Sequence, residues 1–224
     1  MDQVRVIELK ESVFADNDQE ADKLRQALKR RGQYLLNVMS SPGAGKTSTL
    51  TKLIAQMQDH YAIGVMEADI DSDVDTNRII EETGAVAIQL HTGGMCHLDA
   101  GMCAQGLASL DAESLDLIFL ENVGNLVCPA EFDTGACANA VILSVPEGDD
   151  KPLKYPLMFE RADVVIINKM DVAPYFDFDV DRFEQNLRRR NKECNLIRVS
   201  ARTGEGIDLL AQWLSNRVDA WRCA

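Results

Sequence analysis

The stretch Tyr34–Leu50, YLLNVMSSPGAGKTSTL, decides the fold of this 224-residue chain. It begins with an apolar run, Tyr34–Met39, that has the length and composition of a buried strand. A loop of small residues, Ser40–Thr47, follows, and the apolar positions of Ser48–Met57 then recur at helical spacing. A strand that enters a glycine-rich loop and leaves it as a helix is typical of a phosphate-binding loop. The sequence therefore predicts a nucleotide site here.

The residue types within this loop suit such a site. Gly43 and Gly45 let the backbone turn so that successive N–H groups point into one concavity, where the helix start adds partial positive charge. Lys46 is expected to reach the β- and γ-phosphates, and the Thr47 hydroxyl to bind Mg²⁺. The general pattern has glycine at position 40, where this chain has Ser40. The loop residues expected to bind nucleotide are Gly43, Ala44, Gly45, Lys46, Thr47 and Ser48.

Further apolar runs alternate with helical patterns along the chain. Six more strands are predicted over Ala62–Met66, Ala85–Leu90, Leu115–Leu120, Ala140–Val145, Val164–Ile167 and Leu196–Val199. The other predicted helices are Asp16–Arg31, Thr76–Glu82, a helix that follows a turn at Gly93-Gly94 and runs through about Leu110, Tyr155–Glu160, Asp181–Arg190 and Ile207–Val218. Asp16 or Asn17 is expected to cap the first helix, and Val4–Leu9 to form a strand or an arm.

This alternation predicts an α/β fold of the P-loop NTPase type, a mostly parallel sheet with helices on both faces. Residues 1–224 are expected to form one domain, in which residues 1–32 precede the first core strand. In such sheets ligands bind at the carboxyl ends of the strands.

Polar residues follow three predicted strands at these ends. Glu121 can hold Mg²⁺ through a water, and Gly124 can bring its N–H to the γ-phosphate. Asp171, in the motif N-K-x-D, can accept hydrogen bonds from N1–H and the 2-amino group of guanine, a pair of donors that adenine lacks. Lys169 can lie along the base, and Asn168 can brace the loop. Backbone N–H groups after the last strand are expected to meet guanine O6, at Ser200, Ala201 and Arg202. The motifs predict GTP rather than ATP.

The composition excludes several classes of function. There are 36 Asp and Glu against 23 Lys and Arg, which argues against a nucleic-acid partner or an anionic membrane surface. No apolar run is long enough to span a membrane, and the N-terminus lacks the pattern of a signal peptide, so neither is expected. The six cysteines contain no C-x-x-C pair, which with a nucleotide site indicates a reduced, cytoplasmic protein.

Three soft metal ligands lie near the predicted nucleotide site. Cys96 and His97 are adjacent after a Gly-Gly turn, close to a predicted helix start that favours a thiolate, and Cys128 comes four residues after Gly124. Thiolate and imidazole suit Zn²⁺ or Ni²⁺. Three ligands are one short of a closed tetrahedral site, which a second copy of the chain could complete. The residues alone equally allow two buried thiols and an ordinary histidine. Cys103 is too far along its helix to share the metal and is expected in the core.

Together these motifs resemble the HypB-type GTPases, which deliver nickel during maturation of nickel–iron hydrogenases. The resemblance covers essentially the whole chain and rests on Ser40–Thr47, Asp69, Asp75, Arg78, Thr92–Ala100, Glu121–Pro129, Glu147–Lys154 and Asn168–Asp171. Serine at position 40 is usual in that family. Some relatives hold nickel at an N-terminal Cys motif or store it in a His-rich stretch. Neither role is expected here, because no cysteine precedes Cys96 and the histidines are His60, His91 and His97.

The resemblance implies a slow GTP hydrolase that uses Mg²⁺, binds Ni²⁺ or Zn²⁺, and forms a homodimer favoured by GTP and metal. The implied partners are other nickel-delivery and hydrogenase-maturation proteins and the hydrogenase precursor. Asp69 and Asp75 match the switch acids, which could touch Mg²⁺ through water or orient the attacking water; Asp75 is preferred for Mg²⁺. Lys151 and Lys154 are implied to contact nucleotide or partner across the dimer. The expected catalytic residues are Lys46, Thr47, Asp75 and Glu121, and the expected Ni²⁺ or Zn²⁺ ligands are Cys96, His97 and Cys128.

Two alternatives stay open beside this interpretation. A GTPase of the urease-maturation type has the same fold but normally a single Cys-Pro-His metal motif, so the separate Cys96-His97 and Cys128-Pro129 pairs favour hydrogenase. A metal-carrying scaffold would bind GTP with negligible turnover. The remaining acids of the segment after the second strand, Glu67, Asp71 and Asp73, are expected in a solvated, mobile loop.

Overall fold

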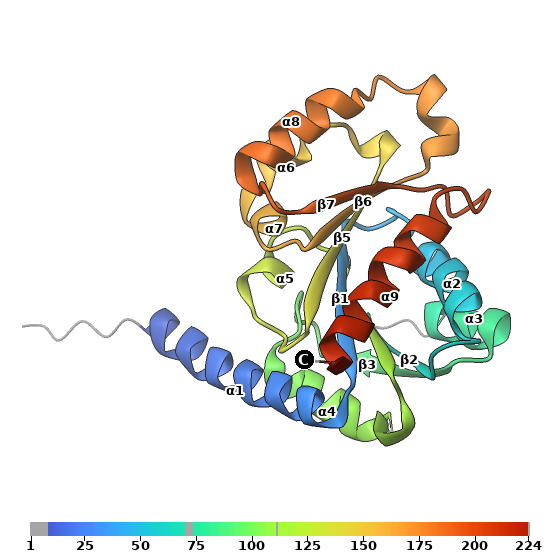
Figure 1. Cartoon of the computed structure of the whole chain (residues 1–224). Helices are drawn as coiled ribbons and strands as arrows, with labels where there is room; N and C mark the ends of the chain where they lie inside the picture. Colours follow the sequence, from blue (N-terminus) through green and yellow to red (C-terminus); the bar gives the residue numbers. More distant parts are fainter. Residues whose placement is uncertain (1–8, 70–73, 111, 224) are drawn as a thin grey trace, which may run out of the picture.

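A computed structural model describes residues 9–69, 74–110 and 112–223, and the side chains from residue 14 onward (Figure 1). Seven strands form one sheet in the order β3-β2-β4-β1-β5-β6-β7, and every neighbouring pair is parallel. The strands are β1 (Tyr34–Ser40), β2 (Ile63–Asp69), β3 (Val86–His91), β4 (Leu117–Glu121), β5 (Ala138–Ser144), β6 (Val164–Asn168) and β7 (Asn195–Arg198). All seven predicted strands are present, and the predicted parallel α/β fold is confirmed.

Helices cover both faces of this sheet. They are α1 (Leu9–Arg31), α2 (Lys46–Met57), α3 (Val74–Thr83), α4 (Ala100–Ser109), α5 (Cys128–Glu131), α6 (Lys151–Lys154), α7 (Pro156–Glu160), α8 (Val180–Arg190) and α9 (Ile207–Cys223). Three short 3-10 turns, η1 (Ala112–Ser114), η2 (Val145–Glu147) and η3 (Met170–Tyr175), complete the connections. Asp99 and Asp179 cap α4 and α8 by accepting backbone N–H groups at 2.8 and 2.9 Å.

The central strand β1 is buried at all seven positions because helices pack on both sides of it. Alternate side chains point to opposite faces. Tyr34, Leu36 and Val38 join the core under α2, α3 and α9. Leu35 and Met39 point the other way, Leu35 into the core formed with α1 and α4, and Met39 into a separate core formed with α7 and α8 (Figure 1). The sheet is therefore a rigid frame whose carboxyl edge carries the functional loops.

The predicted start of the first helix is wrong. Helix α1 begins at Leu9, so neither Asp16 nor Asn17 caps it. Asn17 instead lies inside the helix and is buried, where its side chain is hydrogen-bonded to Ala100 and Asp133. Of the predicted strand or arm at Val4–Leu9, residues 4–8 lie outside the described residues and Leu9 is helical. Helix α4 begins only at Ala100, because Asp99 is its cap.

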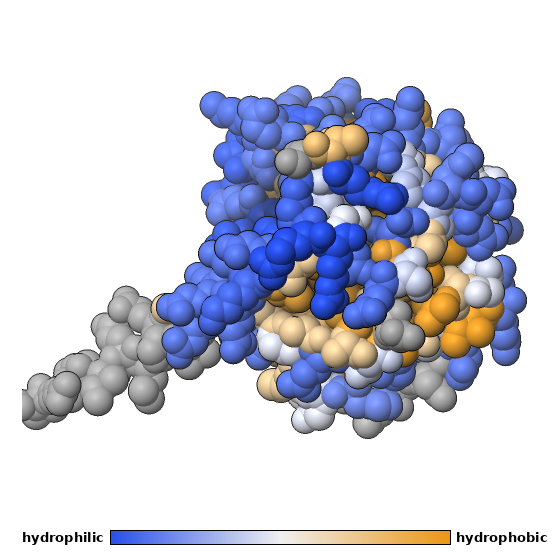
Figure 2. All heavy atoms as spheres, turned by 60° about the horizontal axis from the view of Figure 1, so that its bottom comes forward, coloured by the Kyte–Doolittle hydropathy of each residue, from blue (hydrophilic) through white to orange (hydrophobic). Residues whose placement is uncertain are grey.

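The exposed side of α1 is hydrophilic, and hydrophobic side chains gather beside it on the same face of the molecule, as Figure 2 shows. The helix buries Ala21 and Leu28 against the sheet and turns its charged residues outward. No helix within the described residues is both long and apolar enough to cross a membrane.

Candidate functional site

The loop between β1 and α2 has the shape that the sequence predicts. Gly43 and Gly45 have φ of +75° and +94°, in the left-handed region that favours glycine. A Cβ on Gly45 would lie 2.5 Å from Asn168 Nδ2, so close approach of the β6 loop also requires glycine here. Lys46 Nζ donates to Ser40 Oγ at 3.0 Å across the loop. Ser40, which replaces the glycine of the general pattern, thus gives the lysine a hydrogen-bond partner within the loop.

Asn168 joins three segments at the base end of the site. Its Nδ2 donates to Ala44 O at 3.0 Å, and its Oδ1 accepts the N–H groups of Lys169 and Ala201 at 2.7 and 3.1 Å. Lys169 has a φ of +63°, which turns its side chain back so that Nζ donates to Gly43 O at 2.7 Å. The predicted bracing role of Asn168 therefore matches its contacts.

Asp171 lies in a cavity of about 480 Å³ beside the phosphate loop. Ser200 Oγ donates to Asp171 Oδ1 at 2.7 Å and fixes the carboxylate. The cavity is lined by Gly45, Ser48, Lys52, Arg78, Glu82, Asn168, Lys169, Asp171, Val172, Ala201 and Arg202. The N–H groups of Ser200 and Ala201 donate to Glu205 O and Asn168 Oδ1, and the expected contact of Ser200, Ala201 and Arg202 with guanine O6 stays a prediction.

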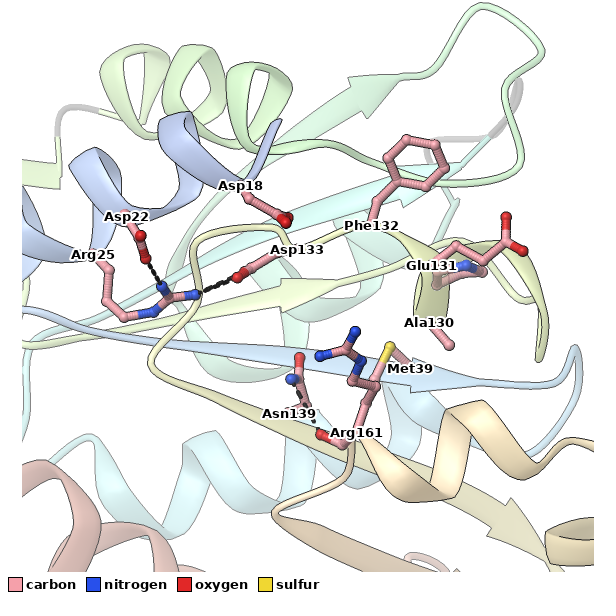
Figure 3. A pocket seen from close by; sticks show the side chains of 11 residues that line it. Asp18, Asp22, Arg25, Met39, Ala130, Glu131, Phe132, Asp133, Asn139 and Arg161 are labelled. Atoms are coloured by element: carbon pink, nitrogen blue, oxygen red, sulfur yellow. Dashed lines mark hydrogen bonds and ion pairs between the residues drawn. The ribbon is translucent and has the colours of Figure 1, made fainter. Parts of the chain in front are cut away.

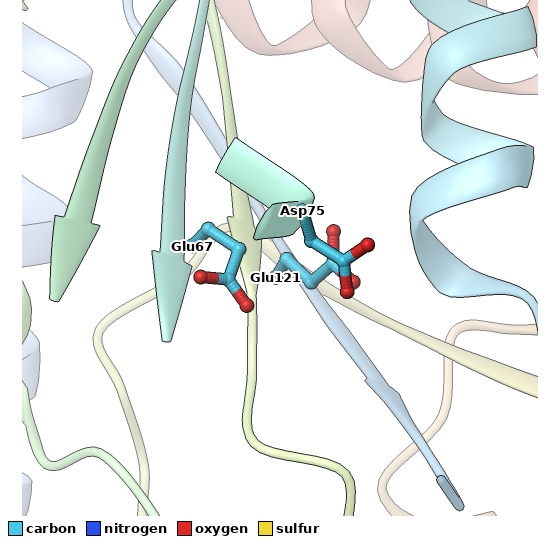
Figure 4. A group of neighbouring side chains, drawn as sticks. All are labelled: Glu67, Asp75 and Glu121. Carbon is cyan, nitrogen blue, oxygen red and sulfur yellow. The ribbon is translucent and has the colours of Figure 1, made fainter. Parts of the chain in front are cut away.

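Three carboxylates converge at the ends of β2 and β4, as Figure 4 shows. Ligand oxygens of Glu67, Asp75 and Glu121 all lie within 4.8 Å of one another. Thr47 Oγ1 donates to Glu121 Oε1 at 2.9 Å, while Glu121 Oε2 is buried and has no hydrogen-bond partner among the described residues. Asp69 ends β2 beside this group. Thr47, Asp75 and Glu121, predicted as the Mg²⁺ site, are thus brought together.

Burial raises the pKa of Glu121 to about 7, and burial together with the charge of Glu121 raises that of Glu67 to about 7. Crowded, buried carboxylates require a proton or a cation. Hard oxygen ligands with one unsatisfied atom, Glu121 Oε2, fit a divalent cation such as Mg²⁺.

The prediction that Glu67 lies in a solvated loop is wrong. Glu67 belongs to β2, is 3% exposed, and stands opposite Glu121 in the register of β2 and β4. Thr76 Oγ1 donates to it at 3.3 Å. The register shows why it was missed, because the sequence alone does not reveal that β2 and β4 are neighbours. Asp71 and Asp73 lie outside the described residues.

Cys96, His97 and Cys128 come together within one chain. Cys96 and His97 lie in the loop before α4, and Cys128 is the first residue of α5. Cys96 Sγ is 3.9 Å from His97 Nδ1 and hydrogen-bonds the Cys128 side chain. Their ligand atoms do not all lie within 4.8 Å of one another. Cys103 is fully buried in the core, as predicted.

The protonation of these groups differs from the prediction for Cys96. Its hydrogen bond with Cys128, followed by burial, raises the pKa of the Cys96 thiol, and α4 begins too late for its positive end to favour a thiolate. Burial lowers the pKa of His97, which favours the neutral imidazole that binds metals. A metal must therefore displace a thiol proton at Cys96.

Lys151 and Lys154 do not line the cavity that contains Asp171. Lys154 pairs with Asp150, and Lys151 lies 5.5 Å from the Tyr155 ring. Neither lysine therefore contacts the nucleotide cavity of its own chain. The predicted contact across a dimer stays a prediction.

The sheet order, the phosphate loop and the strand-end motifs define a P-loop nucleotide-binding protein. Residues 34–198 match the family described as CobW/HypB/UreG, nucleotide-binding domain, so the chain belongs to this family. It is 46% identical over 214 residues to the hydrogenase maturation factor HypB of Rhizobium leguminosarum bv. viciae, covering 96% of this chain and 71% of that protein.

Two further comparisons agree with this assignment. HypB of Escherichia coli K12 is 43% identical over 224 residues, covering 100% of this chain and 76% of that protein. The crystal structure of Helicobacter pylori HypB in complex with nickel superposes with a TM-score of 0.86 at 36% identity, covering 92% of this chain and 96% of that chain. The resemblance to HypB that the sequence motifs indicated is confirmed.

Proposed function

We propose that this chain is a GTPase whose nucleotide state controls a nickel site during the maturation of nickel–iron hydrogenases. One observation carries the proposal. The segment Glu121–Cys128 touches the phosphate loop at one end and bears a metal ligand at the other: Glu121 accepts from Thr47, and a Cβ on Gly124 would lie 3.3 Å from Pro42. A nucleotide that moves this segment would therefore move the Cys128 sulfur.

GTP is the proposed nucleotide because Asp171 presents a carboxylate held by Ser200 in the cavity beside the loop. The carboxylate would accept two hydrogen bonds from guanine, which adenine cannot replace. The phosphates would lie at the start of α2, where Gly43 and Gly45 open the backbone toward them.

Hydrolysis would use the acids at the ends of β2 and β4. Thr47, Asp75 and Glu121 would hold Mg²⁺, which supplies charge that stabilises the transferring phosphoryl group. Lys46 would leave Ser40 for the phosphate oxygens. Asp69 or Asp75 would orient the attacking water. Residues 1–224 would act as one GTPase domain.

The metal cargo would bind to Cys96, His97 and Cys128. Nickel is the proposed metal because the superposing HypB structure is a complex with nickel, and Zn²⁺ would suit the same soft ligands. Ni²⁺ often takes square-planar ligands where Zn²⁺ takes tetrahedral ones, so a shift of Cys128 would alter affinity for the two metals unequally. A second copy of the chain would supply the fourth ligand position, in a homodimer favoured by GTP and metal.

The setting follows from the names of the relatives, which are hydrogenase maturation factors. We propose that the partners are other nickel-delivery proteins and the hydrogenase precursor, in the cytoplasm.

A metal titration with and without a non-hydrolysable GTP analogue tests the coupling. Ni²⁺ affinity should differ between the GDP-bound and analogue-bound forms, and by reciprocity Ni²⁺ should change nucleotide affinity by the same factor. Equal affinities in both forms would contradict the proposal. Phosphate release in Mg²⁺ would separate a GTPase from a scaffold that only binds GTP.

Light scattering tests the assembly. The chain should be a monomer without ligands and a dimer with analogue, Mg²⁺ and Ni²⁺. A monomer under every condition would contradict the shared site.

A further inference from the structure

One buried side chain of α1 contacts segments that adjoin the proposed nickel ligands: the start of α4, which follows Cys96 and His97, and the loop after α5, the helix that begins at Cys128. Asn17 is 7% exposed and lies inside the helix. Its Oδ1 accepts the N–H of Ala100 at 3.0 Å, and its Nδ2 donates to Asp133 O at 3.0 Å. Ala100 comes three residues after His97, and Asp133 five residues after Cys128. A single carboxamide therefore spans the two loops.

A second anchor lies two turns farther along α1. Arg25 Nη2 donates to both oxygens of the Asp133 carboxylate, at 2.7 and 2.8 Å, and Arg25 Nε donates to Ala136 O at 3.0 Å (Figure 3). A Cβ on Gly135 would lie 2.9 Å from the Leu24 side chain, so the loop presses against the helix. The loop after α5 is thus held to α1 at several points.

An aromatic contact reaches His97 itself. Its ring stacks on that of Phe132, with centroids 3.8 Å apart and planes 11° apart. Phe132 in turn lies 5.0 Å from the Phe14 ring of α1. The orientation of the His97 imidazole is therefore set by a ring that α1 supports.

These contacts differ from ordinary helix packing. Burying an amide costs free energy unless its groups are hydrogen-bonded, and a leucine in the same helix position would pack without that demand. Between α1 and the loop lies a polar cavity of about 310 Å³, which Asp18, Phe132 and Arg161 help to line (Figure 3). The polar contacts therefore add to the apolar cluster in which Leu28 and Leu24 of α1 join Leu98 and Ala136 of the two loops.

We propose that Asn17 is a positioning residue for the nickel site. Its two hydrogen bonds fix the distance between the Cys96–His97 loop and the Cys128 loop, while Arg25 and Phe132 hold the loop after α5 in place. The inference rests on the proposed function, which makes Cys96, His97 and Cys128 metal ligands. Outer contacts that orient ligands typically change metal affinity by about 10- to 100-fold when removed.

The test uses the full chain with Ni²⁺ as the probe and Co²⁺ as a spectroscopic substitute. Asn17→Leu keeps the size of the side chain and removes both hydrogen bonds. We expect Ni²⁺ to bind about tenfold or more weakly and the Co²⁺ thiolate charge-transfer band to shift. The affinity for a GTP analogue without metal should stay as in the wild type, because Asn17 contacts no residue of the nucleotide cavity.

Leu28→Ala is the matched control, since Leu28 is also buried on α1 but lies eleven residues beyond Asn17, where it lines a cavity with Leu107 and Ala112 near the other end of α4. It should lower the melting temperature at least as much as Asn17→Leu and leave Ni²⁺ affinity and the Co²⁺ spectrum unchanged. An equal loss of Ni²⁺ affinity in Leu28→Ala would overturn the inference, because general destabilisation would then explain both variants.

The two proposals fail in different ways. If Cys128→Ala binds Ni²⁺ like the wild type, the proposed nickel site is wrong. If Cys128→Ala loses Ni²⁺ and Asn17→Leu does not, the site stands and the positioning role of Asn17 is overturned. Should Asn17→Leu fail to fold, Arg25→Gln, at a half-buried position, should weaken Ni²⁺ in the same direction, and wild-type affinity there would overturn the inference.

Discussion

The base end of the nucleotide cavity and the thiol loops differ in how closely hydrogen bonds hold their side chains together. At the base end, Asn168 makes three hydrogen bonds and Ser200 holds Asp171 at 2.7 Å. At the thiol loops, the free thiols of Cys96 and Cys128 are hydrogen-bonded, Cys96 Sγ lies 3.9 Å from His97 Nδ1, and the three ligand atoms do not all lie within 4.8 Å of one another. Base binding requires little rearrangement, whereas a metal must draw its ligands together and displace a proton. Small loop shifts should therefore tune metal affinity far more than base affinity.

The largest expected effect is a loss of GTP affinity at the base end of the nucleotide cavity. Asp171→Ala would remove two hydrogen bonds from a charged acceptor, each worth about 1.5–3 kcal/mol. We expect GTP affinity to fall by roughly 100-fold or more and the preference over ATP to disappear, as measured by competition with a fluorescent nucleotide. Ser200→Ala, which only frees the carboxylate, should have a smaller effect. Unchanged GTP affinity in Asp171→Ala would show that Asp171 does not recognise the base.

Substitutions in the thiol loops should change the affinity for Ni²⁺. Cys128→Ala should weaken Ni²⁺ binding by at least the roughly 10- to 100-fold typical of lost supporting contacts, and should erase the difference between GDP- and GTP-bound forms. GTP binding should be largely retained. Cys103→Ala, in the buried core, should do neither. A nucleotide-dependent Ni²⁺ affinity in Cys128→Ala would mean that coupling follows another route.

The buried carboxylates Glu67 and Glu121, which lie at the ends of β2 and β4, should make the stability of the protein depend on pH. Glu67 and Glu121 have pKa values raised from 4.5 to about 7, so between these values the folded state holds more protons than the unfolded state. Stability contributed by these groups therefore falls as pH rises from about 4.5 to 7.

Glu67→Gln, which stays neutral, tests this dependence. Between pH 5 and 8, in the absence of nucleotide and metal, the melting temperature of Glu67→Gln should fall less than that of the wild type. The two falls should differ by several degrees, because each kcal/mol of unfolding free energy corresponds to about 2–4 °C in melting temperature. Glu82→Gln, at an exposed site, is the control. Parallel curves for Glu67→Gln and the wild type would contradict a shared titration of Glu67 and Glu121.

The smallest effect is expected at Ser40. Binding of phosphate requires Lys46 to leave Ser40 Oγ, a contact worth roughly 0.5–1 kcal/mol net. Ser40→Gly should therefore strengthen GTP affinity about two- to fivefold in a calorimetric titration. Ser41→Gly, whose side chain instead bonds Glu147, should not. Weaker GTP binding in Ser40→Gly would mean that the Ser40 hydroxyl contacts the nucleotide itself.

Local patterns explain what the sequence could predict. The phosphate loop and the N-K-x-D motif each lie within a few consecutive residues, so strand, turn and side chain can be read together. Glu67 was misplaced because its role depends on β2 lying beside β4, an order that no local pattern reveals. Asn17 was misjudged because a polar residue near a helix start usually caps it, and its two partners lie 83 and 116 residues away.

The contacts of Asn168 also bear on how the chain folds. Its side chain bonds Ala44 across 124 residues, and Lys169 bonds Gly43 across 126. Such long-range pairings in a parallel sheet form slowly, because the intervening chain must be ordered first. A growing polypeptide would expose residues 43–47 long before residue 168 exists. Competence to bind nucleotide should therefore appear late in refolding, together with the docking of β6, and a fluorescent GTP analogue would report the completion of folding.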